Sequence, residues 1–196
     1  MSSTLSPNGL TPSRRWGSAS NSTGTNMYNI ADGYATALFT GALVEVSAGN
    51  IVILANSTNA NGSTPIGVFQ GCQYTALNGT PTWSSYWPAA TSVMTGSQAI
   101  GYVCDDPYAT FMIQADGPVS AQNLMTTNYE VNIGTGGSTF TGVDNTSLKY
   151  NSGVTTASAL VRPIAYEATP GNTQASAYPR LEVELIHHAL RQGAVS

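Results

Sequence analysis

The fold of this chain is decided by the stretch GALVEVSAGNIVILA, residues 41–55. Two apolar runs, residues 37–46 and residues 51–55, flank the loop SAGN at residues 47–50. Glycine and asparagine tolerate the positive φ angles that a tight turn between antiparallel strands requires. The stretch therefore predicts a β-hairpin.

Further strands are predicted wherever a short apolar or alternating run is bounded by turn residues. These runs are residues 66–74, 80–87, 99–104, 110–114, 129–133, 139–143, 159–166 and 180–187. No window repeats apolar residues at the helical period over three turns, although residues 119–124 and 158–161 have room for a single turn. The sequence predicts an all-β fold, a compact β-sandwich or β-barrel-like domain with an extended N-terminal arm.

Two of these strands carry detailed patterns. In residues 66–74, Gly67 and Gly71 mark a close backbone approach or a bulge. Four side chains of that strand are expected on its other face: Ile66, Val68, Cys72 and Tyr74. In residues 180–187 the leucine and valine side chains alternate with acidic ones, which predicts a half-buried strand with its polar face outward. The inward residues there are Leu181, Val183 and Leu185, and the outward ones are Glu182 and Glu184.

Residues 1–34 contain few apolar side chains and show no periodicity. Such a segment cannot bury enough surface to fold alone, so it is either a flexible leader or an extended arm ordered by docking on something else. Arg14, Arg15 and Trp16 favour the arm, since arginine and tryptophan are over-represented among the residues that dominate interfaces. We therefore divide the chain into an arm at residues 1–34 and a β-rich domain at residues 35–196.

Charged residues make up only 8 % of the 196-residue chain, against roughly 25 % in an average soluble domain. With six Lys and Arg against ten Asp and Glu, the net charge of −4 argues against binding to nucleic acid or to an anionic lipid surface. The 41 % hydrophobic fraction is sufficient for a core. No apolar run approaches the roughly 20 residues that span a bilayer, and the N-terminus lacks the pattern of a secretory signal. We expect no membrane association and no Sec export.

The residues that most often carry chemistry are few. Cys72 and Cys104 have no metal-site spacing and are expected to be reduced and buried, the alternative being a disulfide between neighbouring strands. His187 and His188 are adjacent on a predicted strand, so they point to opposite faces and are expected to form a surface or inter-subunit hydrogen-bonding pair. We expect no catalytic residue, no metal and no cofactor.

Acidic side chains are densest at Asp105, Asp106 and Asp116, but they lack the spacing of a calcium loop and are expected to serve turns. Three aromatic residues are close together in the stretch TWSSYW: Trp83, Tyr86 and Trp87. Such side chains pack on a protein neighbour, stack on sugars or fill a core, because they combine an apolar face with a polar tip.

Four stretches together resemble the head decoration, or cement, proteins of tailed bacteriophages. They are residues 41–74, residues 84–89 (SSYWPA), residues 104–117 (CDDPYATFMIQADG) and residues 162–193, which contain RLEVELIHH. The resemblance implies a non-enzymatic structural virion protein, assembled in the host cytoplasm. It would bind the outer surface of the capsid and stabilise it by bridging capsomers of the major capsid protein. It also implies self-association as a homotrimer or a dimer, and terminal arms that reach across capsid subunits.

A second reading of the residues is a glycan-binding or adhesion β-sandwich module of a phage particle, based on the aromatic cluster and the Ser-, Thr- and Asn-rich loops. An enzyme such as a glycosidase or an esterase is the third. The copy number per particle separates the first two, because a cement protein covers the head whereas an adhesin is present in a few copies.

Overall fold

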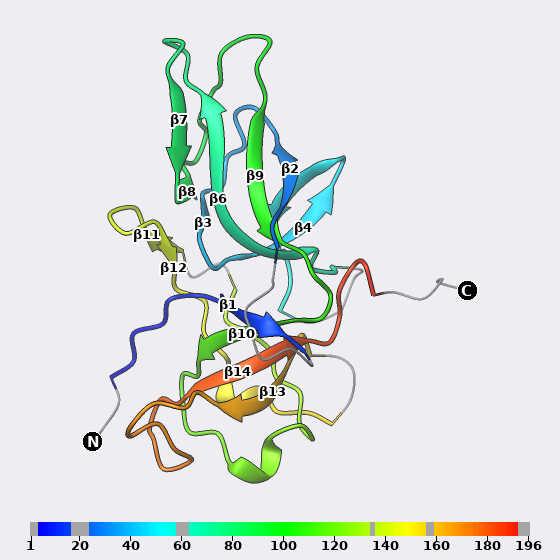
Figure 1. The fold of residues 1–196 in the computed structure, drawn as a ribbon, viewed down its shortest axis with the longest axis vertical. Helices are drawn as coiled ribbons and strands as arrows, with labels where there is room; N and C mark the ends of the chain where they lie inside the picture. The colour runs from blue at the N-terminus through cyan, green and yellow to red at the C-terminus, as the bar shows by residue number, and fades with distance from the viewer. Residues whose placement is uncertain (1–3, 17–23, 58–62, 134–135, 156–158, 192–196) are drawn as a thin grey trace.

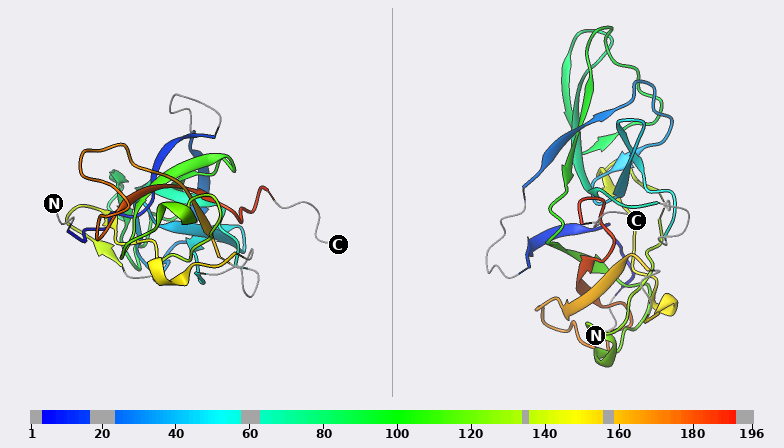
Figure 2. Two further views of the ribbon diagram at one scale, coloured as in Figure 1. Left: turned by 90° about the horizontal axis from the view of Figure 1, so that it is seen from below. Right: turned by 90° about the vertical axis from the view of Figure 1, so that its right-hand side faces the viewer.

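A computed structural model describes residues 4–16, 24–57, 63–133, 136–155 and 159–191. Within these ranges the regular structure consists of antiparallel strands and two single 3-10 turns, η2 (Ala121–Asn123) and η3 (Tyr150–Ser152). The all-β prediction is confirmed, and η2 lies in one of the two places where a single turn was expected. Figures 1 and 2 show an elongated molecule with a large twisted sheet toward one end and a smaller sheet toward the other.

The larger sheet has six strands, in the order β2-β9-β6-β4-β5 with β7 paired to β6. Their bounds are β2 (Asn26–Ile30), β4 (Leu43–Ser47), β5 (Asn50–Ile53), β6 (Gly67–Thr75), β7 (Pro81–Ser84) and β9 (Ala99–Cys104). The sheet curls so that β2 and β5 come close to each other, which gives it a barrel-like interior. The predicted hairpin is confirmed as β4 and β5, with Ala48 and Gly49 at positive φ in the turn.

The smaller sheet has four strands in the order β1-β10-β14-β13. Their bounds are β1 (Thr11–Arg15), β10 (Ala109–Gln114), β13 (Val161–Tyr166) and β14 (Arg180–Leu185). Two short pairs lie between the large sheets: β3 (Leu38–Phe39) with β8 (Tyr86–Trp87), and β11 (Gly137–Ser138) with β12 (Val143–Asp144). We call the two large units the six-stranded sheet and the four-stranded sheet.

A bulge in β6 divides the core. The register of β6 against β9 shifts between Phe69 and Gly71, so Phe69 and Cys72 both face the interior of the six-stranded sheet. Val68 packs instead into the core of the four-stranded sheet. The glycine prediction is confirmed, because a Cβ on Gly67 would clash with the carbonyl oxygen of Cys104. The prediction of one continuous face from residue 66 to residue 74 is wrong, since a one-residue slip turns the later side chains to the other side.

The prediction of an arm at residues 1–34 needs correction for the part that the structure describes. β1 pairs with β10 as an edge of the four-stranded sheet, and β2 pairs with β9 as an edge of the six-stranded sheet. Leu10 is completely buried in the core of the four-stranded sheet. The segment is extended as expected, but it docks on the chain's own sheets, because an edge strand gains hydrogen bonds from backbone groups that are independent of side-chain hydrophobicity. Residues 17–23 lie outside the described ranges.

The prediction for the last strand is half right. Leu181, Val183 and Leu185 are buried as expected. Glu182 is only 5 % exposed, because β1 and the side chain of Arg14 cover it. Two further strands are absent where they were expected: residues 129–133 form only isolated bridges, and residues 139–141 form the turn between β11 and β12. The strand predicted at residues 159–166 is confirmed as β13, which begins at Val161, so the single turn for which residues 158–161 have room does not include Val161.

Candidate interaction surface

Charge is distributed unequally between the two sheets. Asp32 and Glu45 are the two charged residues between positions 24 and 104, a range that holds all of the six-stranded sheet. No lysine or arginine occurs between Arg15 and Lys149. The ion pairs among the described residues accordingly lie on the four-stranded sheet and its loops. A partner of the six-stranded sheet therefore meets hydrogen-bonding groups and apolar side chains rather than charge.

Arg14, predicted as an interface anchor, is used within the chain. Its Nε and one terminal nitrogen donate to the two carboxylate oxygens of Glu182 at 2.7 Å and 3.0 Å. The Thr110 hydroxyl donates to the same carboxylate at 2.7 Å. The hydrogen bond from Arg14 lowers the pKa of Glu182 below its ordinary value, against the opposing effect of burial. This trio fixes β1 onto the sheet.

The two other predicted anchors are both exposed but differ in their contacts within the chain. Arg15 forms an ion pair with Asp106 at 3.2 Å, and its guanidinium lies 5.6 Å from the centroid of the Tyr108 ring. Trp16 donates its backbone N–H to the carbonyl of Tyr108 at 2.8 Å, and its side chain remains 47 % exposed. Both side chains can therefore be reached by a partner, but that of Arg15 already takes part in an ion pair within the chain.

The aromatic cluster predicted at residues 83–87 is separated by the fold. Trp87 is completely buried in the core of the six-stranded sheet, with Tyr74 edge-on against it at 5.3 Å between centroids. Tyr86 stacks on Phe39 at 5.4 Å. Trp83 is 68 % exposed. The core interpretation thus holds for Trp87, and Trp83 is the residue of this cluster presented most fully to solvent.

Trp83 borders a shallow hollow of about 310 Å³ on the outer face of the six-stranded sheet. Its indole Nε1 donates to the side-chain oxygen of Gln73 at 3.0 Å, and the Tyr102 hydroxyl donates to the same oxygen at 2.7 Å. Gly71 lies in the lining between these strands and leaves the backbone uncovered. The lining residues are Gln70, Gly71, Cys72, Trp83, Ser84, Ser85 and Tyr102. Sequence reasoning missed Gln73 and Tyr102, because their proximity depends on the register of β6 against β9.

The hairpin of β11 and β12 presents Phe140 with 97 % of its surface exposed. The hairpin is closed by the Gly142 N–H, which donates to the Ser138 carbonyl at 2.7 Å. It is tied to the body through Thr40, whose N–H donates to Gly142 and whose carbonyl accepts from Asp144, both at 2.9 Å. Phe140 was missed because residues 139–143 were assigned to a strand. The surrounding glycines, typical of a turn, were the signal that a hairpin tip lay there.

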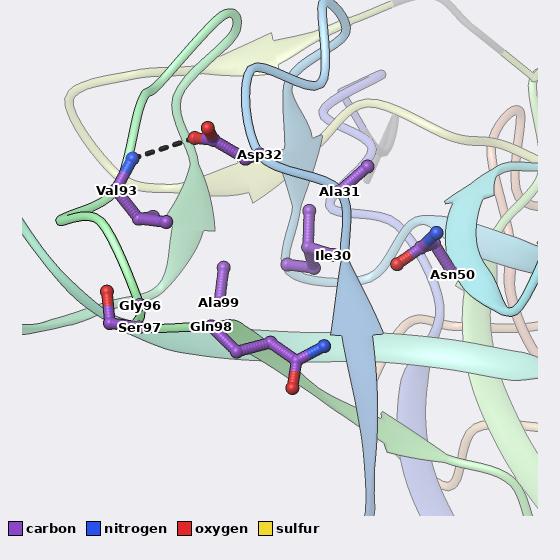
Figure 3. A pocket seen from close by; sticks show the side chains of 9 residues that line it. All are labelled: Ile30, Ala31, Asp32, Asn50, Val93, Gly96, Ser97, Gln98 and Ala99. Atoms are coloured by element: carbon purple, nitrogen blue, oxygen red, sulfur yellow. Dashed lines mark hydrogen bonds between the residues drawn. The ribbon is translucent and has the colours of Figure 1, made fainter.

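A second hollow, of about 360 Å³, lies where β2 and β9 meet the loop before β9 (Figure 3). The Asp32 carboxylate at its rim accepts the Val93 N–H at 2.8 Å and so fixes the loop. Figure 3 shows the side chains of Gln98 and Asn50 apart from Asp32 around the opening. The single acid of this hollow is engaged in holding the fold.

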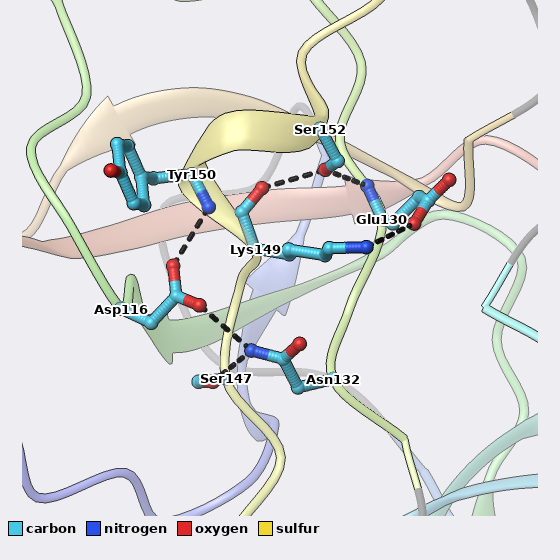
Figure 4. Close-up of polar contacts among 7 residues, drawn as sticks. All are labelled: Asp116, Glu130, Asn132, Ser147, Lys149, Tyr150 and Ser152. Atoms are coloured by element: carbon cyan, nitrogen blue, oxygen red, sulfur yellow. Dashed lines mark hydrogen bonds and ion pairs between the residues drawn. The ribbon is translucent and has the colours of Figure 1, made fainter.

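The acidic residues near the four-stranded sheet each have separate partners. Asp116 accepts from the Tyr150 N–H at 2.8 Å and from Asn132 at 2.9 Å, so it joins three loop segments (Figure 4). Asp105 accepts from Asn26 and from the Tyr28 hydroxyl, the latter at 2.6 Å. The expectation is confirmed for Asp106, which accepts the Tyr108 N–H at 2.9 Å, and for Asp116, and it is wrong for Asp105, whose partners are side chains of β2. Among the residues with described positions, no group of three acidic, histidine or cysteine side chains is placed to hold a metal ion.

Both cysteines lie on strands of the six-stranded sheet, and both histidines follow β14. Cys72 and Cys104 are buried thiols that form no disulfide, which confirms the expectation for both. Burial raises the pKa of the Cys72 thiol to about 12, and the thiol donates to the Tyr86 carbonyl. His188 is buried rather than at the surface, so the prediction of a surface pair is wrong for it. Its Nδ1 accepts the Leu190 N–H at 3.2 Å, and its Nε2 has no hydrogen-bond partner among the residues that the structure describes.

The described part of the chain contains no helix that is long and apolar enough to cross a membrane. No protein family, curated protein sequence or solved structure matches this chain.

Proposed function

We propose that this chain is a non-enzymatic structural protein of a bacteriophage head. In this proposal it binds the outer surface of the capsid and stabilises it by bridging capsomers of the major capsid protein. The resemblance of its sequence stretches to head decoration proteins motivates the proposal. The structural observation that supports the proposal most is the exposed Phe140, on a hairpin that hydrogen bonds to Thr40 hold in place.

Phe140 has the properties of an anchor for a protein partner. The ring is almost completely exposed, and the backbone that carries it is fixed by hydrogen bonds to Thr40. Full burial of a phenylalanine side chain contributes about 1.5–3 kcal/mol. A side chain held in place before binding loses little conformational entropy on binding, so much of that contribution is available as affinity. An apolar pocket between capsid subunits is the complementary surface.

The nearly uncharged surface of the six-stranded sheet is compatible with close packing beside other copies of the chain in a protein shell. Charge normally keeps freely diffusing proteins apart, and this region has almost none. Where many copies pack beside each other on a shell, a neutral face avoids repulsion between neighbours. The resemblance to decoration proteins implies self-association as a trimer or a dimer, for which Trp16 offers a second exposed aromatic contact.

Two measurements test the proposal. Quantitative mass spectrometry of purified particles should find the chain at a copy number comparable with that of the major capsid protein. An absence from the head, or a few copies at the tail, would overturn it. In a cosedimentation assay with undecorated heads, Phe140→Ser should weaken attachment by about ten- to a hundredfold while leaving the melting temperature unchanged. Leu77→Ser, an exposed apolar residue in the turn between β6 and β7, serves as the matched control. An equal loss of attachment in Phe140→Ser and Leu77→Ser would show that Phe140 is not the anchor.

A further inference from the structure

The hollow is lined by the exposed ring of Trp83 and by Tyr102, and Gln73, which lies beside the lining, accepts a hydrogen bond from each of them. Gln73 on β6 lies directly opposite Trp83 on β7, so both side chains project from the same face of the sheet. Tyr102 on β9 reaches the same point from the other side, since its hydroxyl bonds to Gln73. We propose that this hollow is a binding site for a neutral saccharide, with Trp83 as its stacking platform.

The orientation of the Gln73 amide follows from its neighbours. An indole N–H is a donor only, so the atom of Gln73 that faces Trp83 Nε1 at 3.0 Å is the oxygen. The Tyr102 hydroxyl donates to that same oxygen. The amide nitrogen of Gln73 therefore points away from both rings, and no described residue accepts a hydrogen bond from it. It is a fixed donor, and the Tyr102 oxygen remains an acceptor beside it.

Gly71 lines the hollow at the point where β6 and β7 come close together. Its φ is +138°, and a Cβ at this position would lie 2.9 Å from the Ser84 carbonyl oxygen. The missing side chain lets the backbone of β7 approach β6 closely beside the hollow. The volume of the hollow, about 310 Å³, is at the lower end of the range of small-molecule sites, roughly 300–1,000 Å³. It suits one or two sugar rings better than an extended peptide.

The lack of charged residues in the strands around the hollow favours a neutral ligand over an ionic one. Residues 46–104 contain no lysine, arginine, aspartate or glutamate. An anionic ligand such as a nucleotide or a sulfated sugar thus has no counter-charge on these strands, and a cation has no carboxylate. A neutral pyranose presents a C–H face that packs on an indole ring and hydroxyls that match the amide and the Tyr102 hydroxyl.

Saturation-transfer NMR on the full chain tests this site with three neutral probes: cellohexaose, maltohexaose and chitohexaose. At least one probe should receive saturation, and Trp83→Ala should weaken its binding by about tenfold or more. Tyr102→Phe should weaken it by a few fold, since it removes one hydroxyl and leaves the ring. Trp16→Ala is the matched control, because it removes another exposed indole. The affinity of this variant for the probe should stay within about twofold of that of the wild type.

Three outcomes would overturn the saccharide site. They are no transfer to any of the three probes, an equal loss of binding in Trp83→Ala and Trp16→Ala, or tighter binding of a sulfated oligosaccharide than of its neutral counterpart. Trp83→Phe guards against a folding artefact, because it keeps an aromatic platform and should retain part of the binding. The site is independent of the capsid proposal, since Phe140→Ser leaves it intact and Trp83→Ala leaves the hairpin of β11 and β12 intact.

Discussion

The outer face of the four-stranded sheet carries Arg14 and Glu182 in a two-point ion pair, with more ion pairs around it. The outer face of the six-stranded sheet carries Trp83, Gln73 and Tyr102, joined by hydrogen bonds between neutral groups. Both sheets bury an apolar inner face. Apolar burial therefore stabilises both sheets, while the ion pairs among the described residues stabilise the four-stranded sheet and its loops. The outer face of the six-stranded sheet, which lacks ion pairs among its described residues, presents hydrogen-bonding groups and an aromatic ring to a ligand.

The largest expected effect tests whether the two sheets fold as one unit. Phe111→Ala, in the core of the four-stranded sheet, should lower the free energy of unfolding by about 3–5 kcal/mol. Leu43 and Val68 of the six-stranded sheet pack in that same core, so we expect a single shifted transition. Denaturant unfolding followed by both circular dichroism and tryptophan fluorescence measures this.

Met112→Ala is the control, because Met112 is the next residue on the opposite, half-buried face of β10, and its effect should be much smaller. Two separate transitions, with Phe111→Ala moving only one of them, would show that the sheets are independent domains.

The second prediction concerns the ion pair that covers the four-stranded sheet. Glu182→Gln should lower the free energy of unfolding by about 1.5 kcal/mol at neutral pH. This value is at the lower end of the range for hydrogen bonds to charged groups, and we use it because solvent screens the partly exposed Arg14. The pKa of Glu182 is lowered in the folded state. Its contribution is therefore present above its ordinary pKa of 4.5 and is lost as the pH falls through the folded value.

Urea unfolding at a series of acid pH values should show this loss in the wild type and a smaller loss in Glu182→Gln. Glu184→Gln is the comparison, because its ion pairs are longer, at 3.6 Å and 3.9 Å, and should contribute less. Equal acid sensitivity of the wild type and Glu182→Gln would contradict the assignment.

A smaller effect is expected from His188 near neutral pH. Burial lowers its pKa below 6.5, opposed by Asp105 and Asp106 and assisted by Arg191. As the pH falls below about 6.5, the unfolded chain takes up a proton before the folded one does. Stability should therefore decrease between about pH 7.5 and about pH 5.5. His188→Asn keeps an acceptor for the Leu190 N–H and should remove this slope, which thermal unfolding across the range measures.

The smallest effect should come from Arg15→Gln. Its ion pair with Asp106 is exposed, and such pairs contribute about 0–1 kcal/mol. Raising the salt concentration from about 0.1 M to about 1 M shortens the Debye length from roughly 10 Å to 3 Å and should diminish even this difference. Melting temperatures of the two proteins at both salt concentrations test it, and a difference that grows with salt would contradict an electrostatic origin.

The local patterns were readable in advance. The turn at Ala48 and Gly49, the strand Ala99–Cys104 and the inward Leu181 and Val183 follow from spacing and turn chemistry within a few residues. The sequence predicted less of the candidate sites than of the strands and turns. Trp83 was identified among the aromatics, but its difference from Trp87 depends on strand positions on either side of Ser85, and its partners Gln73 and Tyr102 come from two other strands.

The sequence by itself determined the all-β class, the main hairpin and the neutral composition, because these depend on side-chain alternation, on glycine positions and on counts of charge. Only the tertiary structure decided that the N-terminal segment supplies edge strands, that Glu182 is buried and that Phe140 and Trp83 are presented to solvent. Those outcomes depend on which distant strands pair and in what register. The free energy of that pairing comes from backbone hydrogen bonds and buried area summed over the whole sheet, which no short window of residues contains.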